Sequence, residues 1–219
     1  MAIVISDVLD AQKLAALQEA AATLDYEDGR ATAGRYARDV KANLQARKSP
    51  ALDAIFETVR ATLNANEIVT SVARPRRFAR MLLSRYRSGM TYGTHVDDPV
   101  MNGNRTDLSF TLSLSDPGSY VGGELVMEDM LEDRAIRLQA GDMVLYPTSA
   151  LHRVEPVTKG ERVAIVGWIT SWVRDPARRE ILHDLDVAAR ATHEQHGKTP
   201  IFDRIFKTKA NLSRMWYDD

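Results

Sequence analysis

The stretch Arg85-Tyr-Arg-Ser-Gly-Met-Thr-Tyr-Gly-Thr-His95-Val-Asp97 lies within a region of short β-type runs that extends from Glu67 to Trp172. Gly, Pro, Asn and Asp separate these runs, which is typical of an antiparallel sandwich or barrel rather than of βαβ units. Alternate side chains of an extended strand share a face, so His95 and Asp97 are expected to point the same way. Taken alone, a His-x-Asp motif is weak, because any chain with a few histidines contains one by chance.

A second histidine of the β-rich region completes a possible ligand set. His152 begins another strand-like run, His-Arg-Val-Glu-Pro-Val. Two imidazoles and one carboxylate form the facial triad of non-haem Fe(II) sites, which leaves three positions open. The chain has no cysteine and only five histidines, so an iron site here would use nitrogen and oxygen ligands. His183, His193 and His196 lie in a charged helical stretch and are expected to be solvated.

Arg162 is a permanently charged residue in the β-rich region. It lies ten residues after His152, across the Thr158-Lys-Gly-Glu161 turn. The spacing between Arg162 and Trp168 is even, so an unbroken strand would place both side chains on one face. A planar guanidinium on an inward face needs an anionic partner, and a bidentate ligand carboxylate is a natural one.

Helical patterns flank the β-rich region. We expect helices after Ser6-Asp7, from Arg35 to Lys48 and from Pro50 to Asn64, and two more after Pro176. These patterns divide the chain into an N-terminal helical region (1–66), a β domain (67–175) and a C-terminal helical extension (176–219). The apolar face of Ile201 to Trp216 is expected to pack on the barrel, with a homodimer interface as the alternative.

Composition excludes several classes of protein. The chain has 219 residues, of which 44% are hydrophobic, so it can bury a sizeable core. Twenty-nine basic and 30 acidic residues give a net charge of −1, which does not indicate a nucleic-acid partner. The arginines between Arg74 and Arg87 are therefore interpreted as the outer face of a strand. No segment has the pattern of a leader peptide or a membrane span, and we expect a cytoplasmic protein.

Several longer sequence segments resemble those of a known protein family. The order His95-x-Asp97, His152 and Arg162, with Gly122-Gly-Glu-Leu125 between, resembles the Fe(II)/2-oxoglutarate-dependent dioxygenases of the prolyl-4-hydroxylase-like branch. More narrowly, the chain resembles the bacterial PKHD-type hydroxylases, which are associated with iron uptake. The likeness covers nearly the whole chain, including Asp28-Gly-Arg-Ala-Thr-Ala-Gly34, Val40-Lys-Ala-Asn43, Gly167-Trp-Ile-Thr-Ser-Trp172-Val-Arg-Asp175 and Asn211-Leu-Ser-Arg-Met-Trp216.

The resemblance implies a double-stranded β-helix, or jelly-roll, of α+β class with N-terminal helices packed on it. It also implies Fe(II) held by His95, Asp97 and His152, with 2-oxoglutarate bound to the iron and its distal carboxylate on Arg162. The resemblance also suggests Tyr86 as a further contact to the cosubstrate. Another tyrosine that is common in related enzymes is replaced in the stretch from Thr111 to Leu114. O₂ would be the other cosubstrate, and L-ascorbate is a candidate further cofactor. For the substrate pocket the candidates are Tyr92, Asp98, Arg105 and Trp168.

Three functions remain open at this point. The first is a dioxygenase that hydroxylates an unactivated C–H bond of a small molecule, amino acid or peptide and releases succinate and CO₂. The second is a cupin-like metalloenzyme that does not use 2-oxoglutarate, from which Arg162 and its spacing would distinguish the first. The third is a non-catalytic factor of iron homeostasis that binds iron and 2-oxoglutarate.

Overall fold

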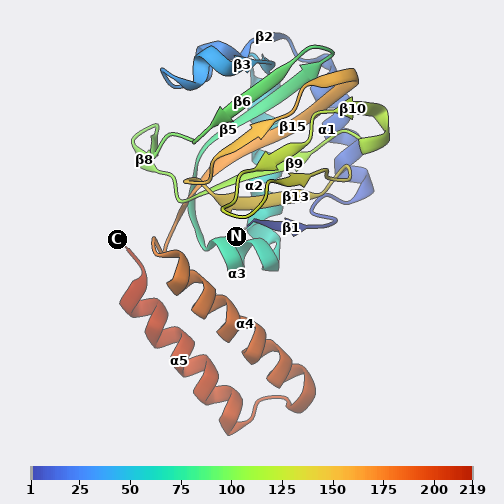
Figure 1. The fold of residues 1–219 in the computed structure, drawn as a ribbon. Coiled ribbons are helices and arrows are strands. Elements are labelled where there is room, and N and C mark those ends of the chain that lie inside the picture. The colour runs from blue at the N-terminus through green and yellow to red at the C-terminus, as the bar shows by residue number, and fades with distance from the viewer. Residues whose placement is uncertain (1, 219) are drawn as a thin grey trace.

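The computed structural model describes residues 2–218 and contains two antiparallel sheets, helices on one side of the larger sheet and a C-terminal helical hairpin (Figure 1). The helices are α1 (Ala11–Thr23), α2 (Pro50–Ala65), α3 (Glu67–Ala73), α4 (Pro176–His196) and α5 (Pro200–Trp216), with short 3₁₀ turns η1 (Gly29–Thr32), η2 (Ala37–Val40) and η3 (Pro117–Ser119). The strands are β1 (Ile3–Ile5), β2 (Tyr26–Asp28), β3 (Lys41–Ala42), β4 (Leu44–Ala46), β5 (Pro75–Arg87), β6 (Thr91–His95), β7 (Val100–Met101), β8 (Asn104–Arg105), β9 (Leu108–Ser113), β10 (Tyr120–Gly122), β11 (Leu125–Met127), β12 (Arg134–Ile136), β13 (Met143–Pro147), β14 (His152–Val154) and β15 (Val157–Ser171).

The larger sheet has the strand order β1-β13-β9-β15-β5-β4-β2, and β10 pairs with β15. Its strands alternate between two environments, as the period of two requires. Phe110 and Leu112 of β9 belong to a buried cluster that includes Ile55 and Val59 of α2. Helices α1 and α2 therefore cover one face of this sheet, and the other face is left for the second sheet.

The smaller sheet has the order β12-β11-β14-β6-β3 and lies against the uncovered face. A second buried cluster joins the sheets, with Leu125 and Val154 from the smaller one and Tyr86, Val144 and Tyr146 from the larger one. This is the α+β, jelly-roll-like sandwich with N-terminal helices and a C-terminal helical extension that the sequence predicts.

The prediction of a helix from Arg35 to Lys48 is wrong. This segment forms the turn η2 and the strands β3 and β4, of which β3 pairs with β6 and β4 pairs with β5. Gly93 of β6 explains the close approach, because a Cβ at that position would lie only 2.8 Å from Val40 Cβ. The segment thus adds a strand to each sheet, although the proposed boundary at residue 66 assigns it to a helical region.

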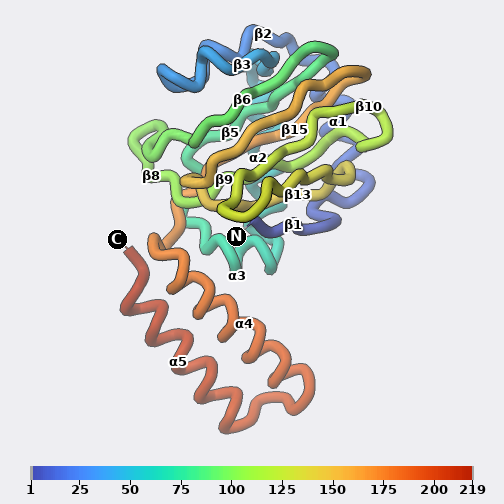
Figure 2. The backbone as a smooth tube through the Cα atoms, in the orientation of Figure 1, coloured from blue at the N-terminus to red at the C-terminus, as the bar shows by residue number. Residues whose placement is uncertain are grey.

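Helices α4 and α5 form a hairpin that projects away from the sheets (Figures 1 and 2). The α5 helix packs along α4, and α4 contacts α3. After α5 the chain returns to the body, where the Asp218 backbone N–H donates to Trp172 O at 2.8 Å and the ring of Tyr217 stacks on that of Trp172. The expectation that α5 packs on the barrel is therefore wrong.

The domain boundaries at residues 66 and 175 stay predictions. Within residues 2–218, none of the helices combines the length and the apolar character needed to cross a bilayer.

Candidate active site

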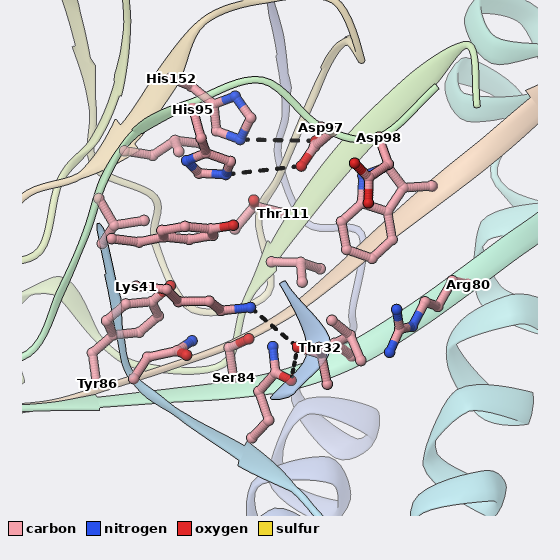
Figure 3. Close-up of a pocket in the computed structure, with 18 of the residues that line it drawn as sticks. Thr32, Lys41, Arg80, Ser84, Tyr86, His95, Asp97, Asp98, Thr111 and His152 are labelled. Atoms are coloured by element: carbon pink, nitrogen blue, oxygen red, sulfur yellow. Dashed lines mark hydrogen bonds and ion pairs between the residues drawn. The ribbon is translucent and has the colours of Figure 1, made fainter. Parts of the chain in front are cut away.

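His95 and His152 lie side by side across two neighbouring strands. His95 ends β6, His152 begins β14, and the two residues are direct partners in the antiparallel register. Their ring centroids are 4.3 Å apart. Asp97, two residues beyond the end of β6, turns its carboxylate toward both rings, with Oδ1 3.8 Å from His95 Nε2 and Oδ2 3.8 Å from His152 Nε2 (Figure 3).

The three side chains have a donor set suited to a divalent metal. One nitrogen from each histidine and one carboxylate oxygen lie within 4.8 Å of one another, and this set of ligands is the facial triad used for non-haem Fe(II). Within residues 2–218, no other group of three His, Asp or Glu side chains meets the same condition.

Backbone carbonyls orient both imidazoles. His95 Nδ1 lies 2.8 Å from Gly93 O, and His152 Nδ1 lies 3.0 Å from Ala150 O. Because a carbonyl can only accept, each Nδ1 must carry the hydrogen, which leaves the lone pair on Nε2 facing Asp97. Burial and the adjacent His152 ring lower the pKa of His95, so its neutral, metal-binding form is favoured.

A residue that the sequence analysis missed positions the carboxylate. Ser109 on β9 is buried, and its hydroxyl donates to Asp97 Oδ2 at 2.7 Å. The alternation of β9 carries the signal, since Ser109 and Thr111 occupy the face opposite Phe110. The hydrogen bond holds the carboxylate in the orientation in which Oδ1 faces His95 and Oδ2 faces His152.

Arg162 is a buried cation in the same cavity. Its side chain is on β15 opposite Tyr86 of β5, with the guanidinium carbon 5.4 Å from the Tyr86 ring centroid. Arg162 is 6% exposed, and within the described chain no acidic side chain lies within ion-pair distance of it. A buried guanidinium without a protein anion fits a ligand carboxylate.

Most of the other predicted site residues line this cavity. Tyr86, Tyr92, Asp98 and Trp168 do so, and the Tyr92 ring stacks on that of His95 at 3.6 Å between centroids. Arg105 does not: its guanidinium donates to Asp107 at 2.8 Å and to Ser171 O at 3.1 Å, outside the cavity.

The cavity also contains polar residues that the sequence analysis did not assign to it. They are Thr32, Lys41, Asn43, Gln45, Arg80, Ser84 and Tyr146. The interpretation of the arginines from Arg74 to Arg87 as an outer face is wrong for Arg80, because the even-numbered residues of β5 face the cavity. Polar residues alternate with other residues at positions 41, 43 and 45. This period of two is typical of a strand, and it is the sequence signal for these lining residues.

The phenols of the cavity stay protonated. Burial raises the pKa of Tyr86 to about 12, and burial together with the charge of Asp97 raises the pKa of Tyr92 and of Tyr146. At neutral pH these groups can therefore donate hydrogen bonds to a ligand oxygen.

One of the three remaining histidines is not simply solvated. His183 on α4 is half-buried, and its Nδ1 lies 2.9 Å from Ser71 Oγ on α3. Its role is in the contact between the hairpin and the body, and it is not part of the cavity.

Comparison with known proteins agrees with this geometry. Residues 81–170 match the family model of the 2OG-Fe(II) oxygenase superfamily. Among solved structures of similar fold, a Pseudomonas putida prolyl-4-hydroxylase has a TM-score of 0.53 at 20% identity, covering 78% of this chain and 92% of its own.

Curated relatives identify the family more narrowly. A PKHD-type hydroxylase of Maricaulis maris is 53% identical over 194 residues, which is 89% of each chain. Another from Synechococcus elongatus is 48% identical over 221 residues, which is 99% of each chain. The chain belongs to the PKHD-type hydroxylases, as its resemblance predicts, and is a 2OG-Fe(II) dioxygenase. Family membership and the His-Asp-His set together imply Fe(II) and 2-oxoglutarate.

Proposed function

We propose that this hydroxylase uses O₂ and 2-oxoglutarate to hydroxylate an unactivated C–H bond of a small molecule, amino acid or peptide, with release of succinate and CO₂. The observation that carries the proposal is the combination of two features in one cavity. These are the three metal-type ligands within 4.8 Å of one another and the buried Arg162, which forms no ion pair with the described part of the chain.

Each feature has a role in this chemistry. His95, Asp97 and His152 would hold the iron, and Arg162 would take the distal carboxylate of 2-oxoglutarate, with Tyr86 beside it. When bound, the metal and the keto acid supply the oxidising power. The protein contributes the orientation of the three ligands, through the Gly93, Ala150 and Ser109 contacts.

Turnover assays test the proposal. Purified protein is incubated with Fe(II), 2-oxoglutarate and O₂ and with a panel of amino acids, peptides and siderophores, and succinate is measured. Succinate formation that depends on the panel member, and that is absent in His95→Ala and Asp97→Ala, is expected. Full activity in either variant would show that the triad is wrongly assigned.

Binding measurements separate the alternatives. A cupin-like enzyme would bind metal without affinity for 2-oxoglutarate, and a non-catalytic factor would bind both without ever forming succinate. Cytoplasmic localisation, a homodimer and a requirement for L-ascorbate also stay predictions. Localisation by fractionation, mass by sedimentation and assays with and without ascorbate address them.

A further inference from the structure

The cavity has a second group of cations, distinct from Arg162. Lys41 of β3 and Arg80 of β5 both line it, together with Thr32, Ser84 and Gln45. Figure 3 shows Lys41, Thr32 and Ser84 on the side of the cavity opposite His95 and His152, with Arg80 beyond them on the same side.

Lys41 is buried without a carboxylate partner. It is 5% exposed, its Nζ donates to Thr32 Oγ1 at 3.2 Å, and it lies 4.9 Å from the Tyr92 ring centroid. Within the described chain no acidic side chain comes within ion-pair distance of it. Burial and the nearby charge of Arg80 lower the pKa of Lys41 to about 8, so most of the amine is still charged at neutral pH. A hydroxyl and an aromatic face offset only part of the cost of burying that charge.

Arg80 is a second cation of the cavity without an acidic partner among the described residues. It is half-buried, and it makes no ion pair with another described residue. Its direct cross-strand partner is Trp168, whose indole Nε1 is buried and finds no hydrogen-bond acceptor among residues 2–218. As cross-strand partners, Arg80 and Trp168 lie next to each other on the face of the sheet that lines the cavity. Both side chains carry N–H groups that can donate to the oxygen atoms of a ligand.

This end is separate from the end that holds Arg162. Arg162 pairs with Tyr86 and Trp168 pairs with Arg80, so the two arginines are six residues apart along the same face of β5 and β15. At about 3.3 Å per residue, the Cα atoms of the two arginines are roughly 20 Å apart along the strands. A carboxylate of 2-oxoglutarate that is bound at Arg162 is therefore expected to leave Arg80 available for another anion.

The charges of the cavity lining support the same conclusion. Lys41, Arg80 and Arg162 are the cations that line it, and Asp97 and Asp98 are the carboxylates. Since a divalent metal and a dianionic cosubstrate cancel, a loaded cavity would keep one uncompensated positive charge.

We propose that Lys41, Arg80 and Trp168 form a subsite that binds an anionic group of the substrate, a carboxylate or a phosphate, during hydroxylation. The inference rests on the proposed function, since it takes the metal and Arg162 as occupied by Fe(II) and 2-oxoglutarate. It narrows the substrate class to anionic molecules or chain ends.

Matched probe pairs test the subsite without turnover. Protein loaded with Mn(II) and 2-oxoglutarate in the absence of O₂ is titrated calorimetrically with N-benzoylglycine and its amide, and with phenyl phosphate and phenol. The charged member of at least one pair is expected to bind at least about 30-fold more tightly than its neutral partner. Which pair discriminates identifies the carboxylate or the phosphate.

Variants locate the effect. Lys41→Met and Arg80→Gln should each remove the preference for the charged probe, while Lys41→Arg keeps it. The control is Arg77→Gln on the same strand, because Arg77 is exposed and donates to Asn104 Oδ1 outside the cavity. Unchanged Mn(II) and 2-oxoglutarate affinities in all four variants show that the cavity is intact.

Three results overturn the inference. They are equal binding of charged and neutral probes, no binding of any probe, and loss of 2-oxoglutarate affinity in Lys41→Met or Arg80→Gln, which would make these residues a cosubstrate anchor. Failure of the wild-type protein to bind Mn(II) or 2-oxoglutarate would instead contradict the proposed function itself.

Discussion

The Asp97 carboxylate depends on a single hydroxyl for its orientation. Ser109 Oγ donates to Oδ2, and both histidine rings are held through Nδ1 by carbonyls of their own strands. The histidine contacts use backbone carbonyls, so they remain when a neighbouring side chain is substituted. The Asp97 contact uses a side-chain hydroxyl, so it is lost when Ser109 itself is substituted. Asp97 is therefore the ligand whose geometry depends most on the side chain of a residue from another strand.

Replacing Ser109 with alanine tests this dependence. The Ser109→Ala variant should bind Mn(II) about 10–100-fold more weakly, because a contact that orients a ligand is lost while the ligand remains. Titration calorimetry measures the change, and Ser113→Ala on the same strand is the control. Wild-type metal affinity in Ser109→Ala would show that Asp97 is positioned by its backbone alone.

Replacing Arg162 tests whether this residue contributes to binding of the cosubstrate but not to binding of the metal. In Arg162→Ala, 2-oxoglutarate binding should weaken by about 2–5 kcal/mol, since a buried charge-assisted pair is lost, and Mn(II) affinity should hardly change. Titration of the Mn(II)-loaded protein with 2-oxoglutarate measures this. An unaltered affinity would mean that another group anchors the distal carboxylate.

Site residues whose position follows from the alternation of a strand could be predicted from the sequence. His95, Asp97 and Arg162 stand at positions where alternation and order along the chain carry a signal. For Ser109 and Lys41, alternation indicates only which side chains share a face, because their contacts depend on which strands become neighbours. That pairing is decided by the packing of the whole sandwich and not by local pattern.

At the scale of elements, a polar cluster around Asp186 is one of the contacts that attach the C-terminal hairpin to the body. Asp186 of α4 accepts from Ser71 Oγ at 3.0 Å and from Lys209 Nζ of α5 at 2.6 Å, and it pairs with the buried Arg74. Burial alone would raise the pKa of Asp186, but the bonds and charges of Lys209 and Arg74 outweigh it and lower the pKa below its ordinary value of 3.8. The cluster joins α3, α4 and α5.

The Asp186→Asn variant should lose about 1.5–3 kcal/mol of stability at neutral pH, the range for a hydrogen bond to a charged group. Since the folded-state pKa is lowered, the stabilisation is present above the unfolded-state pKa near 3.8 and is lost as the pH falls through the folded-state value. The difference between wild type and Asp186→Asn in urea unfolding should therefore shrink below about pH 4. A difference that is constant down to about pH 3 would contradict this account.

The helices were easier to predict than the strands of the N-terminal region. The α2 helix has a Ser49 N-cap, Pro50 in its first turn and an apolar face, so its local signals agree. The segment from Lys41 to Ala46 forms very short strands, whose identity comes from pairing with β5 and β6. Its composition was compatible with a helix, and tertiary contacts outweighed that preference.

At the scale of the whole molecule, the candidate ligands connect parts of the chain that are far apart in sequence. His95 and His152 come from β6 and β14, and Asp97 comes from the loop that follows β6. A metal bound there would hold these strands together and would favour the folded state, because the unfolded chain has no preformed site.

Metal binding should therefore raise the melting temperature. At a free Mn(II) concentration about 100 times the Kd, the stabilisation is about 2.7 kcal/mol, which for a chain of this length corresponds to roughly 5–10 °C. Differential scanning fluorimetry with increasing Mn(II) measures the shift, and Asp97→Ala should show little of it. The same shift in Asp97→Ala would place the bound metal elsewhere.

The segment from Gly29 to Ala46 reaches the cavity from outside the main strands of the sandwich, and it supplies Thr32, Lys41, Asn43 and Gln45 to its lining. The candidate metal ligands come from other parts of the chain. Part of the cavity lining and the candidate metal ligands are thus encoded in separable stretches of sequence, and the two can diverge independently. For protein engineering, this makes the segment a natural unit to exchange between homologues when a different molecule is to be oxidised by the same centre.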